Sequence, residues 1–306
     1  MADSNPIETE RASPRYSGID LWTPADVLDA LIEAQFAAVA ATRAARSSLE
    51  RAALAMEARV RYRGRLVYAG AGTSGRLAVQ DGAELMPTFN WPEQRLVLLL
   101  AGDKEALIRS VEGAEDEVER AERVVRDHVI DSKDVLIAVA ASGTTPFTLA
   151  CMREAKRRGA LTIGIANNPG TPLLEESDHP VLLDTGAEPI AGSTRLKAGT
   201  AQKIALNLLS TLLMISLGRV HDGLMVDVQA VNEKLVRRSE EMLVRLIGCD
   251  REVARDALQR AHGSVKLAVM LLHGCSPEEG VRLIDRAQGR LRSALALIGG
   301  RGTDAA

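Results

Sequence analysis

The glycine-rich turn Gly70–Arg76 constrains this chain more than any other stretch of it. It follows the apolar run Leu66–Tyr68 and precedes a segment with helical spacing. Glycines let the backbone adopt positive φ and come close to a ligand, and the free amides of a helix's first turn attract anions. The sequence therefore predicts a strand, a turn and a helix arranged around a phosphate, with Gly72, Thr73 and Ser74 as binding residues.

The spacing of this turn separates it from two common nucleotide sites. Its glycines fall at positions 70, 72 and 75, which is not the dinucleotide fingerprint. It also lacks the Gly-Lys-Ser/Thr ending of a nucleotide P-loop. Hydroxyls in place of those residues favour a small phosphorylated ligand. A tight turn that holds no ligand is the alternative interpretation.

Composition narrows the class of partner. The 306 residues carry a formal net charge of −3 and only 3% aromatic side chains, which argues against a nucleic-acid-binding surface. Three widely spaced cysteines are typical of reduced thiols rather than of a disulfide framework or a zinc site. The chain begins with polar residues, and its most apolar stretch, residues 206–217, is too short to span a bilayer. We expect a cytoplasmic protein with neither a membrane nor a nucleic acid as partner.

From residue 65 onward, short apolar runs alternate with helical segments. Buried strands separated by helices form a parallel sheet that is covered on both faces. The predicted fold class is therefore α/β, with a five-stranded parallel sheet flanked by helices. The strands are expected at 65–69, 95–100, 134–140, 160–166 and 179–184, and helices at about 75–85, 104–127 and 146–158.

Three parts are expected along the chain. Residues 1–60 hold an extended arm and the N-terminal helices, and residues 61–247 hold the sheet domain. That domain closes with two long helices, at about 192–218 and 225–247, which suit either a dimer interface or packing within the chain. Residues 248–306 form a small C-terminal bundle of three helices. The predicted helix caps are Thr23 and Ser47 in the first part and Asp250, Ser264 and Ser276 in the last.

Two more hydroxyl-rich turns follow predicted strands, at 141–146 and 167–172. Ligands of parallel sheets bind beyond the carboxyl ends of the strands, so these turns favour a shared phosphate pocket. Helix capping alone is the alternative explanation for Thr145 and Thr171. The pocket residues predicted from the second turn are Ser142, Gly143, Thr144 and Thr145.

The first turn of the helix expected at 192–218 carries hydroxyls and cations. Ser193 and Lys197 reach either an anion or only solvent, and both are candidates for binding the phosphorylated ligand.

Two acids stand out, each with a plain alternative. Glu84 lies near the end of a predicted helix, where the macrodipole opposes a negative charge. Glu115 falls in the predicted helix 104–127, where a solvated surface acid is the default interpretation. Gly113 inside that helix costs about 1 kcal/mol relative to alanine, which needs a packing or ligand reason. No histidines are paired at metal-ligand spacing, so no metal site is expected.

Longer motifs resemble those of a known family. GAGTSGR at 70–76, VEGAED at 111–116 and STRLKAGTAQK at 193–203 are similar to segments of the N-acetylmuramic acid 6-phosphate etherases. These enzymes carry a sugar-isomerase-type (SIS) phosphosugar-binding domain, and the resemblance covers about residues 60–300. It implies cleavage of the D-lactyl ether of the phosphorylated amino sugar to N-acetylglucosamine 6-phosphate and D-lactate. The steps would be C2 deprotonation, elimination and addition of water.

By motif position, the resemblance implies Glu84 as the general acid and Glu115 as the base, with Glu84 buried and protonated near neutral pH. It also implies a homodimer, a C-terminal bundle of the ubiquitin-associated type, and no metal or organic cofactor. Two other functions remain open at this point. One is a non-catalytic phosphosugar-sensing regulator similar to the glucokinase regulatory protein, and the other is an aldose–ketose phosphosugar isomerase.

The chain departs from the family pattern in a few places. Leu85 and Met86 stand where a Cys-Pro pair is usual. Thr144 and Asn167 stand where arginine and cysteine are common, and the N-terminal arm lacks the usual Asn-x-Glu-Asp stretch.

Overall fold

The computed structural model describes residues 7–228 and 233–299 of the chain. These residues divide into two compact units. The first unit comprises Met1–Ala83 and Glu93–Ser210, and the second comprises Glu84–Pro92 and Thr211–Ala306. The division falls within two helices, α3 (Gly72–Phe89) and α7 (Lys197–Ser216).

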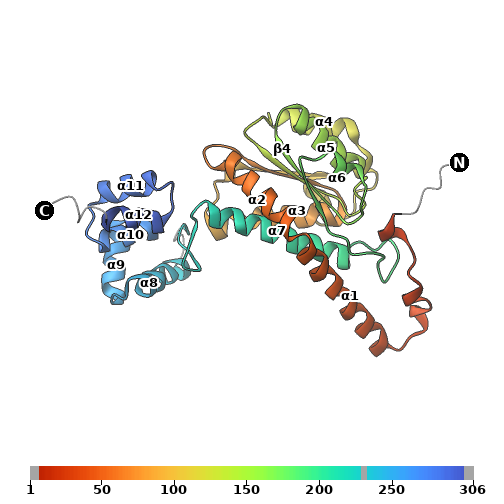
Figure 1. Cartoon of the computed structure of the whole chain (residues 1–306), viewed down its shortest axis with the longest axis horizontal. Coiled ribbons are helices and arrows are strands. Elements are labelled where there is room, and N and C mark those ends of the chain that lie inside the picture. Colours follow the sequence, from red (N-terminus) through yellow and green to blue (C-terminus); the bar gives the residue numbers. More distant parts are fainter. Residues whose placement is uncertain (1–6, 229–232, 300–306) are drawn as a thin grey trace. The chain divides into compact units, whose positions relative to one another are not determined.

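The first unit is built on one parallel sheet with the strand order β2-β1-β3-β4-β5 (Figure 1). All four strand pairings are parallel. The predicted α/β class and the five-stranded sheet are confirmed, with each strand within two residues of its expected bounds. The strands are β1 (Leu66–Gly70), β2 (Leu96–Leu100), β3 (Val135–Val139), β4 (Leu161–Ala166) and β5 (His179–Leu182).

Helices cover both faces of the sheet, as a parallel sheet requires. Val67 and Leu136 point to a face packed with Ala121 of α4 (Val118–Asp127) and Met152 of α5 (Pro146–Arg157). The short helix α6 (Pro172–Glu176) joins this layer, and α2 (Arg46–Val60), α3 and α7 cover the opposite face (Figure 1). Because both faces are covered, exposed and buried side chains do not alternate along β1 and β3.

A buried carboxylate ties β1 to the helices of the second layer. Asp81 of α3 accepts hydrogen bonds from the hydroxyl of Tyr68 on β1 (2.9 Å) and from Asn207 (2.6 Å) and Ser210 (3.1 Å) on α7. Burial raises the pKa of Asp81, while these hydrogen bonds oppose the rise. The three donors hold α3 and α7 in register with the strand that leads into the glycine turn.

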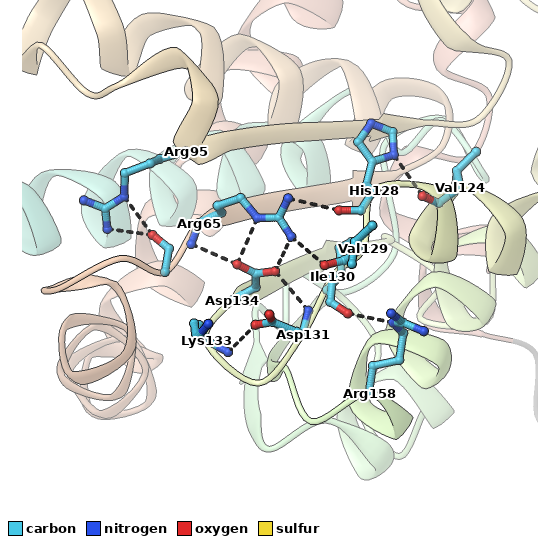
Figure 2. Close-up of polar contacts among 11 residues, drawn as sticks. Arg65, Arg95, Val124, His128, Val129, Ile130, Asp131, Lys133, Asp134 and Arg158 are labelled. Atoms are coloured by element: carbon cyan, nitrogen blue, oxygen red, sulfur yellow. Dashed lines mark hydrogen bonds and ion pairs between the residues drawn. The ribbon is translucent and has the colours of Figure 1, made fainter.

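An ion pair ties the amino ends of β1 and β3 together (Figure 2). The Arg65 guanidinium donates to Asp134 through Nη2 (2.6 Å) and Nε (3.1 Å), and to the carbonyls of His128 and Val129. Burial alone would raise the pKa of Asp134, but the hydrogen bonds from Arg65 and from the Asp131 and Arg65 amides outweigh it and lower that pKa. The starts of the two central strands are thus fixed side by side.

The N-terminal part differs from expectation in detail. The arm folds into three 3-10 turns, η1 (Glu8–Glu10), η2 (Pro14–Tyr16) and η3 (Ile19–Leu21), rather than running extended. Helix α1 (Pro24–Ala44) begins as predicted, with the Thr23 hydroxyl accepting from the Asp26 amide. The predicted Ser47 cap is wrong, because α2 already begins at Arg46 without a side-chain cap.

The single helix expected at 104–127 is wrong. The structure has two short 3-10 turns there, η5 (Asp103–Leu107) and η6 (Ala114–Asp116), and only then α4. Gly113 has φ +71°, a left-handed conformation that an α-helix interior cannot contain. The glycine that looked costly in a helix marks the end of a loop instead. A further 3-10 turn, η4 (Glu93–Arg95), precedes β2.

The second unit contains a hairpin that the sequence patterns did not predict. Strands β6 (Val220–His221) and β7 (Leu224–Met225) are antiparallel and joined by Asp222 and Gly223, both at positive φ. The long helix expected from residue 225 is therefore wrong at its start. Residues 229–232 of that expectation lie outside the described residues, and α8 spans Glu233–Ile247.

A helical bundle completes the second unit. The predicted caps Ser264 and Ser276 are confirmed, since their hydroxyls accept from the amides of Leu267 and Glu279. Asp250 precedes its helix without a side-chain cap bond, so that prediction is wrong. The predicted three helices share their core with α8 and with one more helix. The three predicted helices are α9 (Arg251–Arg260), α10 (Val265–Leu272) and α11 (Pro277–Arg286). The additional helix is α12 (Leu291–Gly299).

The apolar stretch 206–217 lies in α7. By length and composition this helix alone, among those described, is long and apolar enough to cross a membrane. Its most apolar window is 56% buried within the chain, as expected of a helix that packs on a sheet.

The Arg65–Asp134 pair gives a pH-dependent prediction. Replacing Asp134 by Asn should lower the free energy of unfolding at pH 7 by about 2 kcal/mol, because the hydrogen bonds lose their charged acceptor. Folding lowers the pKa of Asp134, so this stabilisation is complete above about pH 4, near the pKa of an aspartate in the unfolded chain. It is lost as the pH falls through the lower pKa that Asp134 has in the folded protein. Urea unfolding at pH 7 and pH 3 tests this, with the exposed Asp127→Asn as control. An equal loss at both pH values would contradict it.

Candidate functional site

Three loops meet at the carboxyl edge of the sheet. β1 and β3 are neighbours in register, with Gly70 opposite Val139, so the turns that follow them leave the same edge. The turn after β4 joins the second of these, because the Asn167 amide donates to the Ala141 carbonyl (3.0 Å). The strands are added on one side of β1 with β2 and on the other side with β3, and parallel sheets open a crevice for a ligand at such a switch point.

The glycine turn brings the start of helix α3 into close contact with the end of β1. Helix α3 begins at Gly72, which has φ +54°. A Cβ on Gly75 would lie 2.7 Å from the carbonyl atoms of Gly70, so only glycine permits this approach of helix to strand. Ser74 is buried and Thr73 half-buried in the first helical turn, where free amides gather. The predicted strand–turn–helix is confirmed as a structure.

The second turn carries a cluster of hydroxyls. Ser142 Oγ accepts from the Thr144 amide (3.2 Å) and lies 3.3 Å from Thr145 Oγ1. Gly143 has φ +72°, and a Cβ there would lie 2.2 Å from Thr171 Oγ1. Neither Thr145 nor Thr171 forms a side-chain cap on the helix it precedes. Helix capping through the side chain therefore does not explain these hydroxyls.

The start of α7 brings a buried cation to the same unit. Lys197 is 6% exposed, and no described residue forms an ion pair or hydrogen bond with its ammonium. Burial lowers the pKa of Lys197, with attraction to Glu188 opposing the shift. Glu188 itself is fully buried and accepts from the backbone amides of Lys197 (3.2 Å) and Ala198 (2.9 Å). The Glu188 carboxylate thus binds the free amides at the start of α7.

The glycine turn and the start of α7 are in contact. A Cβ on Gly199 would lie 3.4 Å from Thr73 Cγ2 and 3.1 Å from the Thr194 carbonyl oxygen. The structure therefore brings Thr73 next to the segment that carries Ser193 and Lys197. The half-buried Ser193 precedes that helix in a turn closed by its carbonyl and the Leu196 amide.

Glu115 lies on the loop that follows β2, the neighbour of β1 on the other side. Its 3-10 turn η6 packs against α5, which begins directly after the hydroxyl turn. The same loop is held to α3 by Arg76, which donates to the carbonyls of Ala106 (2.6 Å) and Arg109 (3.1 Å). The Glu115 side chain is exposed, at the sheet edge from which the three other loops emerge.

Glu84 belongs to the second unit, on the later turns of α3. Its side chain is exposed, so the burial expected for it is not provided within a single chain. Its role as an acid remains a prediction.

The structure also shows polar residues that the motifs did not single out. Glu188 caps α7, and the buried Gln202 donates to Asn167 Oδ1 (2.9 Å), while its own Oε1 has no hydrogen-bond partner among the described residues. Glu188 carries no local signal, and the motif at 193–203 that contains Gln202 does not indicate its contact, because each acquires its partner from another segment. Across 7–228 and 233–299, no three His, Cys, Asp or Glu side chains are grouped to hold a metal ion.

Family models match the segments that carry this site. Residues 48–156 match the N-terminal SIS domain of the glucokinase regulatory protein, and residues 106–212 match the SIS domain. The sheet, its order and the hydroxyl-rich edge thus define a protein of the SIS class.

Curated relatives narrow the class to one family. The chain is 49% identical over 303 residues to an N-acetylmuramic acid 6-phosphate etherase of Deinococcus radiodurans, covering 99% of each chain. Etherases of Geobacillus thermodenitrificans and Streptomyces avermitilis are each 41% identical, over 94% and 97% of this chain and 98% and 96% of their own. The chain belongs to the N-acetylmuramic acid 6-phosphate etherase family, as its motifs indicated.

Gly143 and Gly170 both have a positive φ. Replacing each by alanine tests how closely the turn at 141–146 packs against Thr171. Gly143→Ala should destabilise the chain by about 2 kcal/mol more than Gly170→Ala, because overpacking adds to backbone strain. Gly170 has φ +62° but open space at its Cβ, whereas Gly143 faces Thr171. Urea unfolding of both variants measures the difference. Equal losses would mean that Thr171 moves aside at no cost.

Proposed function

We propose that this chain cleaves the D-lactyl ether of N-acetylmuramic acid 6-phosphate, giving N-acetylglucosamine 6-phosphate and D-lactate. One observation carries the proposal: 49% identity to an N-acetylmuramic acid 6-phosphate etherase over 99% of both chains. The sheet edge described above supports it, because it offers the amides and hydroxyls that a phosphorylated sugar needs.

In this proposal the first two turns and the start of α7 bind the phosphate. Amides of the first turn of α3 and hydroxyls of both turns donate to its oxygens, and the buried ammonium of Lys197 balances its charge. Glu188 supports this arrangement, because its carboxylate is already engaged by two backbone amides. The proposed binding residues are Gly72, Thr73, Ser74, Ser142, Gly143, Thr144, Thr145, Ser193 and Lys197.

The chemistry begins at C2 of the sugar. Opening of the ring makes C1 an aldehyde, which acidifies the C2 proton enough for a positioned carboxylate to remove it. We assign this base to Glu115. Its place on the β2 loop, beside the phosphate-binding turns, supports the assignment.

Elimination then breaks the C3–O bond. The electron pair from C2 forms the C2–C3 double bond, and lactate leaves from C3 with a proton that we assign to Glu84. Water adds back across the double bond, with its hydroxyl at C3 and a proton at C2, so atoms balance with one water consumed. The substrate's aldehyde is the electron sink, so the mechanism requires no metal or organic cofactor.

We also propose that the enzyme acts as a cytoplasmic homodimer. Helix α1 supports this, because it buries alanines and exposes its large apolar side chains. The exposed stripe consists of Leu28, Ile32, Phe36 and Val39, each more than half exposed. A continuous apolar stripe on a helix usually marks an interface, and a two-fold axis lets each copy cover the stripe of the other.

Deuterated water separates the proposed reaction from its alternatives. With N-acetylmuramic acid 6-phosphate in D2O, the etherase releases lactate and leaves deuterium at C2 of the product. A ketose product would instead favour an aldose–ketose isomerase, and binding without turnover would favour a regulator.

The two glutamates should be distinguishable in the same experiment. Glu115→Gln should lose both C2 exchange and lactate release by about a thousandfold, as expected for a general base. Glu84→Gln should lose lactate release while the substrate still exchanges its C2 proton, as followed by proton NMR. Glu112→Gln and Glu93→Gln are control variants at exposed glutamates to which no role is assigned. Full lactate release by Glu84→Gln rules out the acid assignment.

The α1 stripe makes the oligomeric state testable. Wild-type protein should have twice the 32.8 kDa mass of one chain in sedimentation equilibrium. Ile32→Asp combined with Phe36→Asp should shift it to monomer, because charges in an apolar interface are left unpaired. Val129→Asp, a change of an exposed apolar residue that follows α4, should remain dimeric. A dimer that survives the double substitution would place the interface elsewhere.

A further inference from the structure

The N-terminal arm contains one fully buried polar residue. Thr9 has no solvent exposure, although Glu8 is only half-buried and Glu10 is exposed. It lies at the centre of the 3-10 turn η1, which is not long enough to bury a side chain by itself. Its burial comes from contacts with loops more than 150 residues away.

Thr9 is bonded to the loop after β4 by both backbone and side chain. Its amide donates to Asn168 Oδ1 (3.2 Å), and its Oγ1 accepts from Asn168 Nδ2 (3.0 Å). The same Nδ2 donates its other hydrogen to the carbonyl of Ala141 (2.7 Å). Ala141 directly precedes Ser142, so the Asn168 amide group joins the arm to the start of the hydroxyl turn.

Thr9 is also bonded to the segment that leads into α7. The Gly192 amide donates to the Thr9 carbonyl (2.9 Å), and Gly192 directly precedes Ser193. A Cβ on Gly192, which has φ +73°, would lie 2.7 Å from Glu10 Oε2. The positive φ favours glycine at this position, and the Glu10 side chain of the arm lies beside it.

The next turn of the arm, η2, carries a charge that acts on Lys197. Burial lowers the pKa of Lys197, and the positive charge of Arg15 adds to that effect while Glu188 opposes it. Arg15 is held by Glu33 of α1 (2.5 Å between Nη2 and Oε2). Thr9 thus contacts the segment that carries Ser193 and Lys197, and the charge of Arg15 acts on the Lys197 ammonium.

We propose that Thr9 is a positioning residue of the phosphosugar site, acting through Asn168 on the hydroxyl turn and through Gly192 on the approach to α7. The role rests on the proposed function, since it concerns how the same site holds its ligand. Thr9 does not touch the substrate in this assignment. It sets the distance between the two loops whose hydroxyls bind the phosphate, so its loss weakens ground-state binding more than the chemical step.

The hydroxyl is the informative group to remove. Thr9→Val keeps the shape and both backbone hydrogen bonds, but leaves one Asn168 N–H without an acceptor in a buried place. Asn168 then moves to satisfy this donor, and its bond to the Ala141 carbonyl is weakened. Thr9→Ser restores the acceptor and should restore the site.

The control must remove an equally buried hydroxyl far from the loops. Thr42 of α1 is 4% exposed, and its Oγ1 donates to the Ala38 carbonyl (2.8 Å). Thr42→Val therefore reports what the loss of a buried threonine hydroxyl does to stability alone.

The test measures binding and turnover separately. Thr9→Val should raise KM for N-acetylmuramic acid 6-phosphate, and Kd for the product N-acetylglucosamine 6-phosphate, by about tenfold with kcat within about twofold, the scale of one buried hydrogen bond. Thr9→Ser and Thr42→Val should bind as wild type does. Amide exchange at 141–145 should be faster in Thr9→Val only.

The outcomes separate this role from the proposed function. If wild-type protein neither binds nor cleaves the phosphosugar, the proposed function fails and the role of Thr9 fails with it. If wild type is active and Thr9→Val binds equally well, only the role of Thr9 is overturned. If Thr42→Val weakens binding as much, or if Thr9→Ser fails to rescue it, the effect is one of general stability and the assignment is wrong.

Discussion

The pairing of β1 with β3 in one register is the constraint on which the rest of this structure depends. Because these parallel strands end at the same edge, two turns far apart in the sequence leave side by side. The Arg65–Asp134 pair fixes the strands at their amino ends, and Asp81 fixes the covering helices against them. The turns themselves can then remain polar, because the rigidity of the site comes from the apolar and ionic contacts behind it.

Much of the fold could be predicted because its signals are local. A continuous apolar run bounded by glycine or proline indicates a buried parallel strand, and a hydroxyl before a helix indicates a cap. Thr23, Ser264 and Ser276 cap their helices for that reason. The hydroxyls of the two site turns were also visible, because their chemistry does not depend on a distant partner.

The errors have physical causes that can be named. The stretch 104–127 has helical periodicity, yet Gly113 adopts a positive φ and the loop carrying Glu115 departs from the helix. Asp222 and Gly223 form a two-residue hairpin turn, a local signal that an apolar helical pattern concealed. Thr9 and Glu188 gave no signal at all, because each acquires its partner from another part of the fold.

The attachment of Thr9 to Asn168 has a consequence for the order of events in folding. Residue 9 is synthesised long before its partner, so the arm has nothing to dock on while the first half of the sheet is being made. The phosphate-binding edge therefore reaches its final geometry only after β4 has joined the sheet and Gly192 has emerged. Such a contact spans 159 residues of sequence, which makes its formation slow relative to helix formation and a late step of assembly. A newly made chain would accordingly pass through a state with a formed core and an unfinished site.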